Sequence, residues 1–180
     1  RRFAIVGDSW LRSLALGLAE VRLMSWPLIR VDAADIDELM TWFPDARSVD
    51  VWAGPKFPFP FDRQSFHAGC RWQEFASYGL RNPSDELAAF GQLGSRYGRS
   101  HLARLVSNPA MRRQGVGRRL LESLIDVARR EQDCAEVGLF VYRNNIPAYR
   151  CYRSVGFEVR DYPEGAPYPD LCYYLTRPIA

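Results

Sequence analysis

The chain has 180 residues, of which 47% are hydrophobic and 25% charged, and its formal net charge is +3. This length suits one domain of the usual size, roughly 100–150 residues, and the apolar content excludes a mainly disordered chain. Composition also excludes collagen-like, coiled-coil and disulfide-framework proteins, so a globular domain with a sizeable core remains.

Arginine carries almost all of the positive charge, because the chain has 23 Arg and a single lysine, Lys56. Arginine forks suit phosphate oxygens, although a genome rich in G and C gives the same bias. A net charge of +3 is too small to indicate nucleic-acid binding, and no interleaving of aromatic and basic residues supports it. We therefore expect no nucleic-acid partner.

The cysteines are scattered and form no Cys-x-x-Cys pair: Cys70, Cys134, Cys151 and Cys172. The chain has only two histidines, His67 and His101, so local spacing offers no metal site. Cysteines in this pattern are typical of reduced packing residues in a cytoplasmic protein.

Residues 1–24 begin with two arginines and continue with many apolar residues. Charged residues interrupt this run, no convincing cleavage site follows, and the longest apolar stretch is far below the roughly 18 residues of a membrane-spanning helix. We expect 1–24 to be an extension of uncertain status and 25–180 to be the domain, with no membrane partner. A chain that starts at Met24 should then fold.

In chain order, residues 28–31 predict a short strand, and a helix follows that Asp32 caps and Pro44 ends. Residues 53–62 hold three Pro and three Phe, which predicts a loop. The Phe side chains of this loop either line a substrate pocket or attach the loop to the core, and we favour the second role.

Three strands are predicted next, at 73–80, 86–93 and 101–106. The turn-rich segments 82–85 and 94–100 separate them, so these strands form an antiparallel meander.

The rest of the chain alternates between helices and strands. Helical periodicity covers 115–131 with one apolar face, and a second helix is expected over 146–154. Strands are expected at 137–142, 157–159 and 171–175. This order predicts an α/β (α+β) fold with a mixed, mostly antiparallel central sheet that helices flank.

The most informative segment is a strand, a short loop and the start of the long helix. The first turn of a helix has unpaired N–H groups and a partial positive charge. Gly115 and Gly117 carry no Cβ that would keep a ligand away, and Arg112, Arg113 and Arg118 add charge. The segment predicts a phosphate or pyrophosphate site. It matches neither the P-loop nor the Gly-x-Gly-x-x-Gly pattern of dinucleotide-binding folds.

Two motifs in the chain resemble those of the GNAT superfamily, the Gcn5-related N-acetyltransferases. The motif Arg/Gln-x-x-Gly-x-Gly/Ala matches Arg112, Gly115 and Gly117. The motif Asn-x-x-Ala-x-x-x-Tyr-x-x-x-Gly-Phe matches Asn145, Ala148, Tyr152, Gly156 and Phe157. Both motifs stand in the family's order and separation, and the resemblance covers about residues 27–176.

The resemblance implies a GNAT-like acyl-CoA-binding fold with acetyl-CoA as co-substrate and no metal. The pantetheine arm would bind the strand-end backbone of Leu105, Val106 and Ser107, and Asn145 would contact it. The pyrophosphate would bind the backbone of Arg113, Gln114, Gly115, Val116, Gly117 and Arg118. Tyr152 would protonate the departing thiolate. The alternative role for Tyr152 is that of a packing aromatic.

Physical chemistry is consistent with these implied roles. An amine attacks a thioester directly, a backbone N–H at the strand end stabilises the oxyanion, and a phenol with a pKa near 10 supplies a proton at neutral pH.

No general base is assigned. Relatives that acetylate protein N-termini carry a glutamate where this chain has Phe140, which accepts no proton. Glu74, Glu86 and His101 are candidates because they lie near predicted strand ends, and water is another. The acceptor pocket is expected to form from loops within residues 44–72.

The resulting expectation is an N-acetyltransferase that acts on a primary amine of a small molecule. A protein or peptide acetyltransferase and a non-catalytic acyl-CoA sensor module are the alternatives. A homodimer is compatible with each of these three functions.

Overall fold

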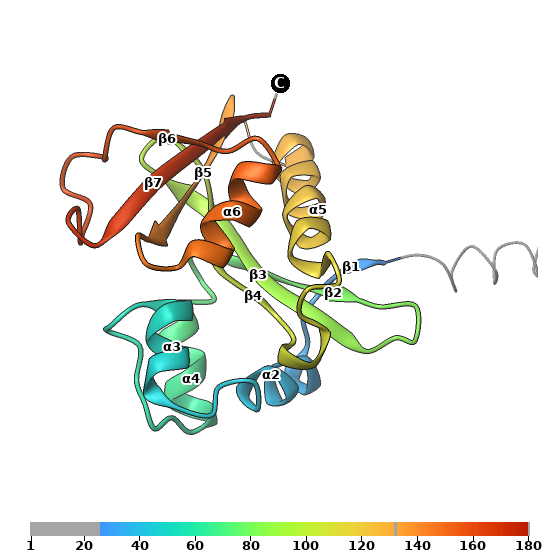
Figure 1. The fold of residues 1–180 in the computed structure, drawn as a ribbon. Coiled ribbons are helices and arrows are strands. Elements are labelled where there is room, and N and C mark those ends of the chain that lie inside the picture. Colours follow the sequence, from blue (N-terminus) through green and yellow to red (C-terminus); the bar gives the residue numbers. More distant parts are fainter. Residues whose placement is uncertain (1–25, 132, 180) are drawn as a thin grey trace, which may run out of the picture.

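The computed structural model describes residues 26–131 and 133–179, so the predicted extension 1–24 lies outside the described residues. Seven strands form one sheet in the order β1-β2-β3-β4-β5-β7-β6 (Figure 1). The strands are β1 (Leu28–Arg30), β2 (Ala76–Arg81), β3 (Leu87–Arg96), β4 (Arg99–Ser107), β5 (Glu136–Tyr142), β6 (Glu158–Arg160) and β7 (Cys172–Pro178). The helices are α2 (Ala33–Met40), α3 (Ala46–Ala53), α4 (Arg63–Cys70), η1 (Pro109–Met111), α5 (Val116–Glu131) and α6 (Ile146–Ser154).

The sheet is mixed, as the sequence predicts. Strands β1 to β4 form an antiparallel meander, and β7 pairs antiparallel with both β5 and β6. The pairing between β4 and β5 is parallel, and α5 makes the connection between these two strands. The prediction of a mostly antiparallel central sheet flanked by helices is confirmed.

Two hydrophobic clusters cover the two faces of the sheet. One contains the apolar face of α5, and the other contains the side chains of α2, α3 and α4. Adjacent residues of β3 divide between them, because Ala89 belongs to the first cluster and Phe90 to the second. Two of the three phenylalanines of the 53–62 loop have the second role predicted for them, since Phe57 and Phe61 pack against Phe66 with ring centroids 5.4 and 4.9 Å away, whereas Phe59 is exposed.

The segment 44–72 is not only loop, and this part of the prediction was wrong. It contains α3 and α4, each of eight residues. An aspartate directly before each helix is its N-cap and accepts a hydrogen bond from a serine N–H three residues later. These capping boxes are Asp45 with Ser48 and Asp62 with Ser65. The spacing Asp-x-x-Ser was the sequence signal for both helices.

The predicted break over 94–100 was also too long. Strand β3 continues to Arg96 and β4 begins at Arg99, so only Tyr97 and Gly98 turn, with φ of 54° and 69°. Two residues with positive φ are typical of the tight turn that matches strand twist. The glycines and serines around the turn lie within the strands. At the other end of the meander, β2 begins at Ala76 rather than at residue 73.

The described residues contain no helix that is both long and apolar enough to cross a membrane. All four cysteines are free thiols.

Candidate active site

The central feature of the site is a split in the sheet between β4 and β5. These strands pair only at Ser100 with Val137 and at His101 with Gly138. Strand β4 then continues to Ser107 and β5 to Tyr142 without further pairing between them. The backbone of the second half of β4 is therefore paired on its β3 side and has no strand partner on its β5 side. Such an edge has free hydrogen-bonding groups for an extended ligand.

A β-bulge in β4 accompanies the split. The register with β3 shifts between Phe90 and Gln92, and Arg104 has a φ of 50°. The Arg104 guanidinium donates to the carbonyls of Gly69 and Cys70 at the end of α4, at 2.8 and 3.3 Å, and to the Gln92 side chain at 2.7 Å. Sequence reasoning missed Arg104, because a bulge leaves no pattern in one strand alone.

Two residues with positive φ precede α5. Gly115 has a φ of 77° and Arg113 a φ of 61°, and the Arg119 N–H donates to the Gly115 carbonyl at 3.1 Å. Within the described residues, no side chain caps the N–H groups of the first turn, whereas aspartate or asparagine caps α2, α3, α4 and α6. An uncapped helix start with exposed arginines fits an anionic pyrophosphate.

Three predicted site segments meet at Gly117. A Cβ built on Gly117 would lie 3.4 Å from Ser107 Oγ at the end of β4 and 3.6 Å from Cys151 Sγ on α6. The structure therefore brings together the strand end, the helix start and the short helix that carries Tyr152. Gly115 differs from Gly117, because nothing lies near its Cβ position and its positive φ is the reason for a glycine there.

Tyr152 lies on α6 beside Cys151, and its half-buried ring packs 6.2 Å from Phe157. Burial raises the pKa of Tyr152, so the phenol keeps its proton at neutral pH. Asn145 caps α6, and its side chain accepts from the Ala148 N–H at 3.4 Å.

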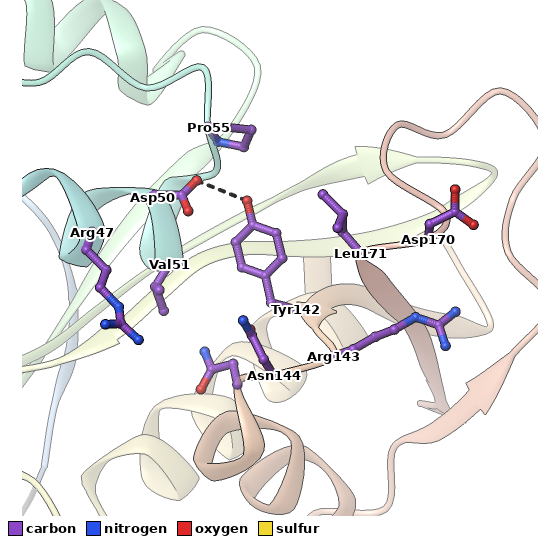
Figure 2. Close-up of a pocket in the computed structure, with 10 residues that line it drawn as sticks. Arg47, Asp50, Val51, Pro55, Tyr142, Arg143, Asn144, Asp170 and Leu171 are labelled. Carbon is purple, nitrogen blue, oxygen red and sulfur yellow. Dashed lines mark hydrogen bonds between the residues drawn. The ribbon is translucent and has the colours of Figure 1, made fainter.

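Helix α3 spans the split on the face opposite α5. Its Trp52 indole N–H donates to the Arg104 carbonyl on β4 at 2.7 Å. The Tyr142 hydroxyl at the end of β5 donates to Asp50 of α3 at 3.1 Å (Figure 2). One side of α3 thus holds β4 and the other holds β5.

A pocket of about 630 Å³ opens beside the Asp50–Tyr142 contact (Figure 2). Its wall joins α3 to the β5–α6 connection and to the residues before β7. Several lining residues fall within the segment 44–72 predicted to form the acceptor pocket, and Asn145 of the second motif lines it too. The pocket therefore adjoins Asn145, one of the residues expected to contact the pantetheine arm.

The three candidate bases are placed differently. Glu74 forms an ion pair with Arg71, and Glu86 accepts from Asn82 at 2.7 Å. Both are exposed, and neither lines the pocket. His101 lies buried at the closed end of the split, where burial lowers its pKa to about 3. A histidine with that pKa is neutral and only weakly basic. No cluster of metal-binding side chains occurs within residues 26–131 and 133–179.

Two relatives by sequence are polyamine acetyltransferases by name. The spermine/spermidine N(1)-acetyltransferase of Bacillus subtilis (strain 168) is 31% identical over 84 residues, which are 47% of this chain and 51% of that protein. The probable spermine N(1)-acetyltransferase of Bacillus subtilis subsp. natto (strain BEST195) matches equally. The chain spans about half the length of these curated relatives.

Solved structures share the fold over most of the chain. The ribosomal-protein-S18-alanine N-acetyltransferase from Escherichia coli is 22% identical, with a TM-score of 0.60 over 87% of this chain and 95% of that one. The spermidine N-acetyltransferase from Vibrio cholerae, in complex with CoA and spermine, is 12% identical. Its TM-score is 0.65, over 84% of this chain and 94% of that one.

A family model described as Acetyltransferase (GNAT) family matches residues 39–157, well over half of the chain. This match includes β4, the start of α5 and α6, the elements that meet at Gly117. The resemblance read from the two sequence motifs is thereby confirmed: the chain belongs to the GNAT family of acetyltransferases.

Proposed function

We propose that the protein transfers the acetyl group of acetyl-CoA directly to a primary amine of a small-molecule acceptor. The observation that carries this proposal is the convergence at Gly117 of a split strand edge, an uncapped helix start and the helix of Tyr152. The names of the sequence relatives, which act on spermine and spermidine, support a small amine as acceptor.

The residues of the site fit the parts of acetyl-CoA. The helix start at Gly115, Val116 and Gly117 would hold the pyrophosphate, and the unpaired edge of β4 at Leu105–Ser107 would hold the pantetheine arm. When bound, the thioester supplies an activated acetyl group. The free backbone groups of β4 orient it and are placed to stabilise negative charge on the thioester oxygen.

The transfer balances without a covalent enzyme intermediate. The neutral amine nitrogen forms a bond to the carbonyl carbon, the C–S bond breaks, and the sulfur receives a proton from the Tyr152 hydroxyl. The new amide nitrogen loses its extra proton to solvent, from which Tyr152 recovers its own. Because residue 140 of β5 is a phenylalanine, no carboxylate at this position deprotonates the amine in this chain.

The test is a pair of substitutions at Gly117. Gly117→Glu should lower acetyl-CoA affinity at least about a hundredfold in calorimetry, because its carboxylate would meet the pyrophosphate. Gly117→Ala is the matched control and should fold and bind, since its Cβ would make contacts of 3.4 and 3.6 Å. Thiol release with a panel of amines measures the activity itself. Retained affinity in Gly117→Glu would place the pyrophosphate elsewhere, and binding without thiol release from any amine would favour a sensor module.

A further inference from the structure

The pocket beside α3 contains a carboxylate with an unusual environment. Asp50 is half-buried, and one of its oxygens accepts a hydrogen bond from the Tyr142 hydroxyl at 3.1 Å (Figure 2). Among the described residues, no arginine, lysine or histidine nitrogen lies within 4.0 Å of Asp50, whereas nine other pairs meet that distance. Desolvation of a carboxylate is costly unless the charge is paired, so a ligand cation beside Asp50 would offset that cost.

Tyr142 fixes the orientation of this carboxylate. Burial and the hydrogen bond to Asp50 raise the pKa of Tyr142, so the phenol keeps its proton and remains the donor. The bond joins residues 92 positions apart in the chain. It leaves the second oxygen of Asp50 available to the pocket.

The other charged residues of the pocket do not neutralise Asp50. Arg143 places its guanidinium 4.6 Å above the Tyr173 ring and donates to the Pro169 carbonyl at 3.3 Å. Arg47 points its guanidinium away from the Asp50 carboxylate (Figure 2). Asp170, on the far wall, is exposed and adds a second negative charge.

The pocket also adjoins the reaction site, because Asn145 lines it and belongs to the motif that is expected to contact the pantetheine arm. The amine that attacks the thioester must be neutral, since a protonated nitrogen has no free electron pair. An ammonium that stays protonated on a carboxylate is therefore not the nucleophile. It is a second group of the same molecule.

We propose that Asp50 binds the non-reacting ammonium of the acceptor, which makes a diamine or longer polycation the substrate class. This inference rests on the proposed function and specifies its acceptor. Asp50 is the residue that distinguishes a dication from a monoamine, and Tyr142 is a positioning residue that acts through it.

The experiment compares two acceptors of equal length, 1,4-diaminobutane and n-pentylamine, which differ only in the second amine. The wild-type enzyme should prefer the diamine in kcat/KM. Asp50→Asn should lower kcat/KM for the diamine about tenfold or more, which is the loss typical of a charged hydrogen bond. The kcat/KM for n-pentylamine should stay within about twofold of the wild-type value. Asp161→Asn removes an exposed charge that does not line the pocket and should change neither value.

Tyr142→Phe gives a second, independent measurement. This variant keeps the negative charge of Asp50 and removes only the Tyr142 hydroxyl. It should therefore lower kcat/KM for the diamine a few-fold, less than Asp50→Asn does. A loss with Tyr142→Phe that is equal for both amines would indicate a structural role rather than a positioning one.

Calorimetric titration of 1,4-diaminobutane into the complex of the enzyme with CoA separates this inference from the proposed function. Weaker diamine binding in Asp50→Asn supports the inference even where no amine releases thiol, an outcome that would reject the acetyl transfer alone. Equal affinity of the wild-type complex for both amines would overturn the inference without any variant. A preference for acceptors that carry a carboxylate would overturn it too and would assign the pocket to Arg47 and Arg143.

Discussion

Tyr152 is the side chain on which the chemistry of the proposed transfer depends most directly. It follows Cys151, whose sulfur lies 3.6 Å from the Cβ position of Gly117, so its helix α6 lies against the start of α5. Burial raises its pKa, which makes it a weak acid that is fully protonated at neutral pH. A free thiolate is a weaker base than a phenolate, so we expect the proton to move while the C–S bond breaks and solvent to return a proton to Tyr152.

Tyr152→Phe tests this role with the smallest change available. The variant removes the hydroxyl and keeps the ring that packs near Phe157, so we expect kcat to fall about a hundredfold while acetyl-CoA affinity stays nearly constant. Steady-state kinetics and calorimetry measure the two quantities. Tyr149→Phe, one turn earlier on α6, is the control and should retain activity. Unchanged kcat in Tyr152→Phe would remove this residue from the mechanism.

At the scale of single elements, α3 decides the shape of the acceptor side. Its eight residues contact β4 through Trp52 and β5 through Asp50, and the pocket opens beside it. The Arg104 guanidinium attaches the end of α4 to the same bulge that Trp52 contacts. These helices therefore keep the two diverging strands at a fixed separation.

The closed end of the split is held by a charged contact between the strands. Arg99 of β4 donates to Glu136 of β5 at 2.6 Å, and Thr176 of β7 donates to the other oxygen of that carboxylate at 3.3 Å. The hydrogen bond from Arg99 lowers the pKa of Glu136. The contact joins three neighbouring strands directly before the first pair of β4 and β5, Ser100 with Val137.

This contact predicts a stability difference that depends on pH. Because the folded-state pKa of Glu136 is lowered, its contribution is complete above the unfolded value of about 4.3 and is lost as the pH falls through the folded value. Glu136→Gln should lower the free energy of unfolding by about 0.5–1 kcal/mol at pH 7, a size that allows for partial solvent exposure. Urea unfolding from pH 7 to pH 3 measures it.

The matched control is Glu158→Gln, which breaks the more exposed pair with Arg160 on the edge strand β6. We expect a smaller effect there. A Glu136→Gln difference that stays constant down to pH 3 would contradict the assignment to Arg99.

At the scale of the whole molecule, one sheet serves two separate tasks. The cluster on the α5 face supports the elements expected to hold the co-substrate, and the cluster on the α2–α4 face supports the pocket. Strands β4 and β5 pair only at their first residues, between these two faces. We expect the acetyl group and the acceptor amine to meet where the strands diverge.

The described contacts of this architecture begin at Trp26, over which the Arg119 guanidinium lies at 5.1 Å. A chain that starts at Met24 keeps every one of these contacts. We expect its melting temperature to stay within about 2 °C of that of the full chain, less than a change of 1 kcal/mol produces in a domain of this size. Differential scanning calorimetry measures it, with acetyl-CoA affinity as a second readout. A large drop would show that residues 1–23 belong to the domain.

The sequence alone predicted the features that short contiguous segments encode. The start of α5 has a glycine-spaced run, its body has one apolar stripe, and α6 ends before Gly156, so each was visible in a window of a few residues. The asparagine cap of α6 was not predicted. The signals for α3 and α4 were also short and contiguous, because each helix starts with a capping box. These capping boxes were missed because the Pro- and Phe-rich segment between the helices led to the prediction of a loop.

Tertiary structure decided what depends on residues far apart in the chain. The divergence of β4 from β5, the bulge at Arg104 and the contact between Asp50 and Tyr142 each require two or three segments to meet. No periodicity or motif indicates these contacts. Their free energy comes from packing and hydrogen bonds between elements that lie far apart in the sequence. The sequence therefore determined the family and the expected co-substrate site, and the tertiary structure determined where the pocket beside α3 lies and which charged residues line it.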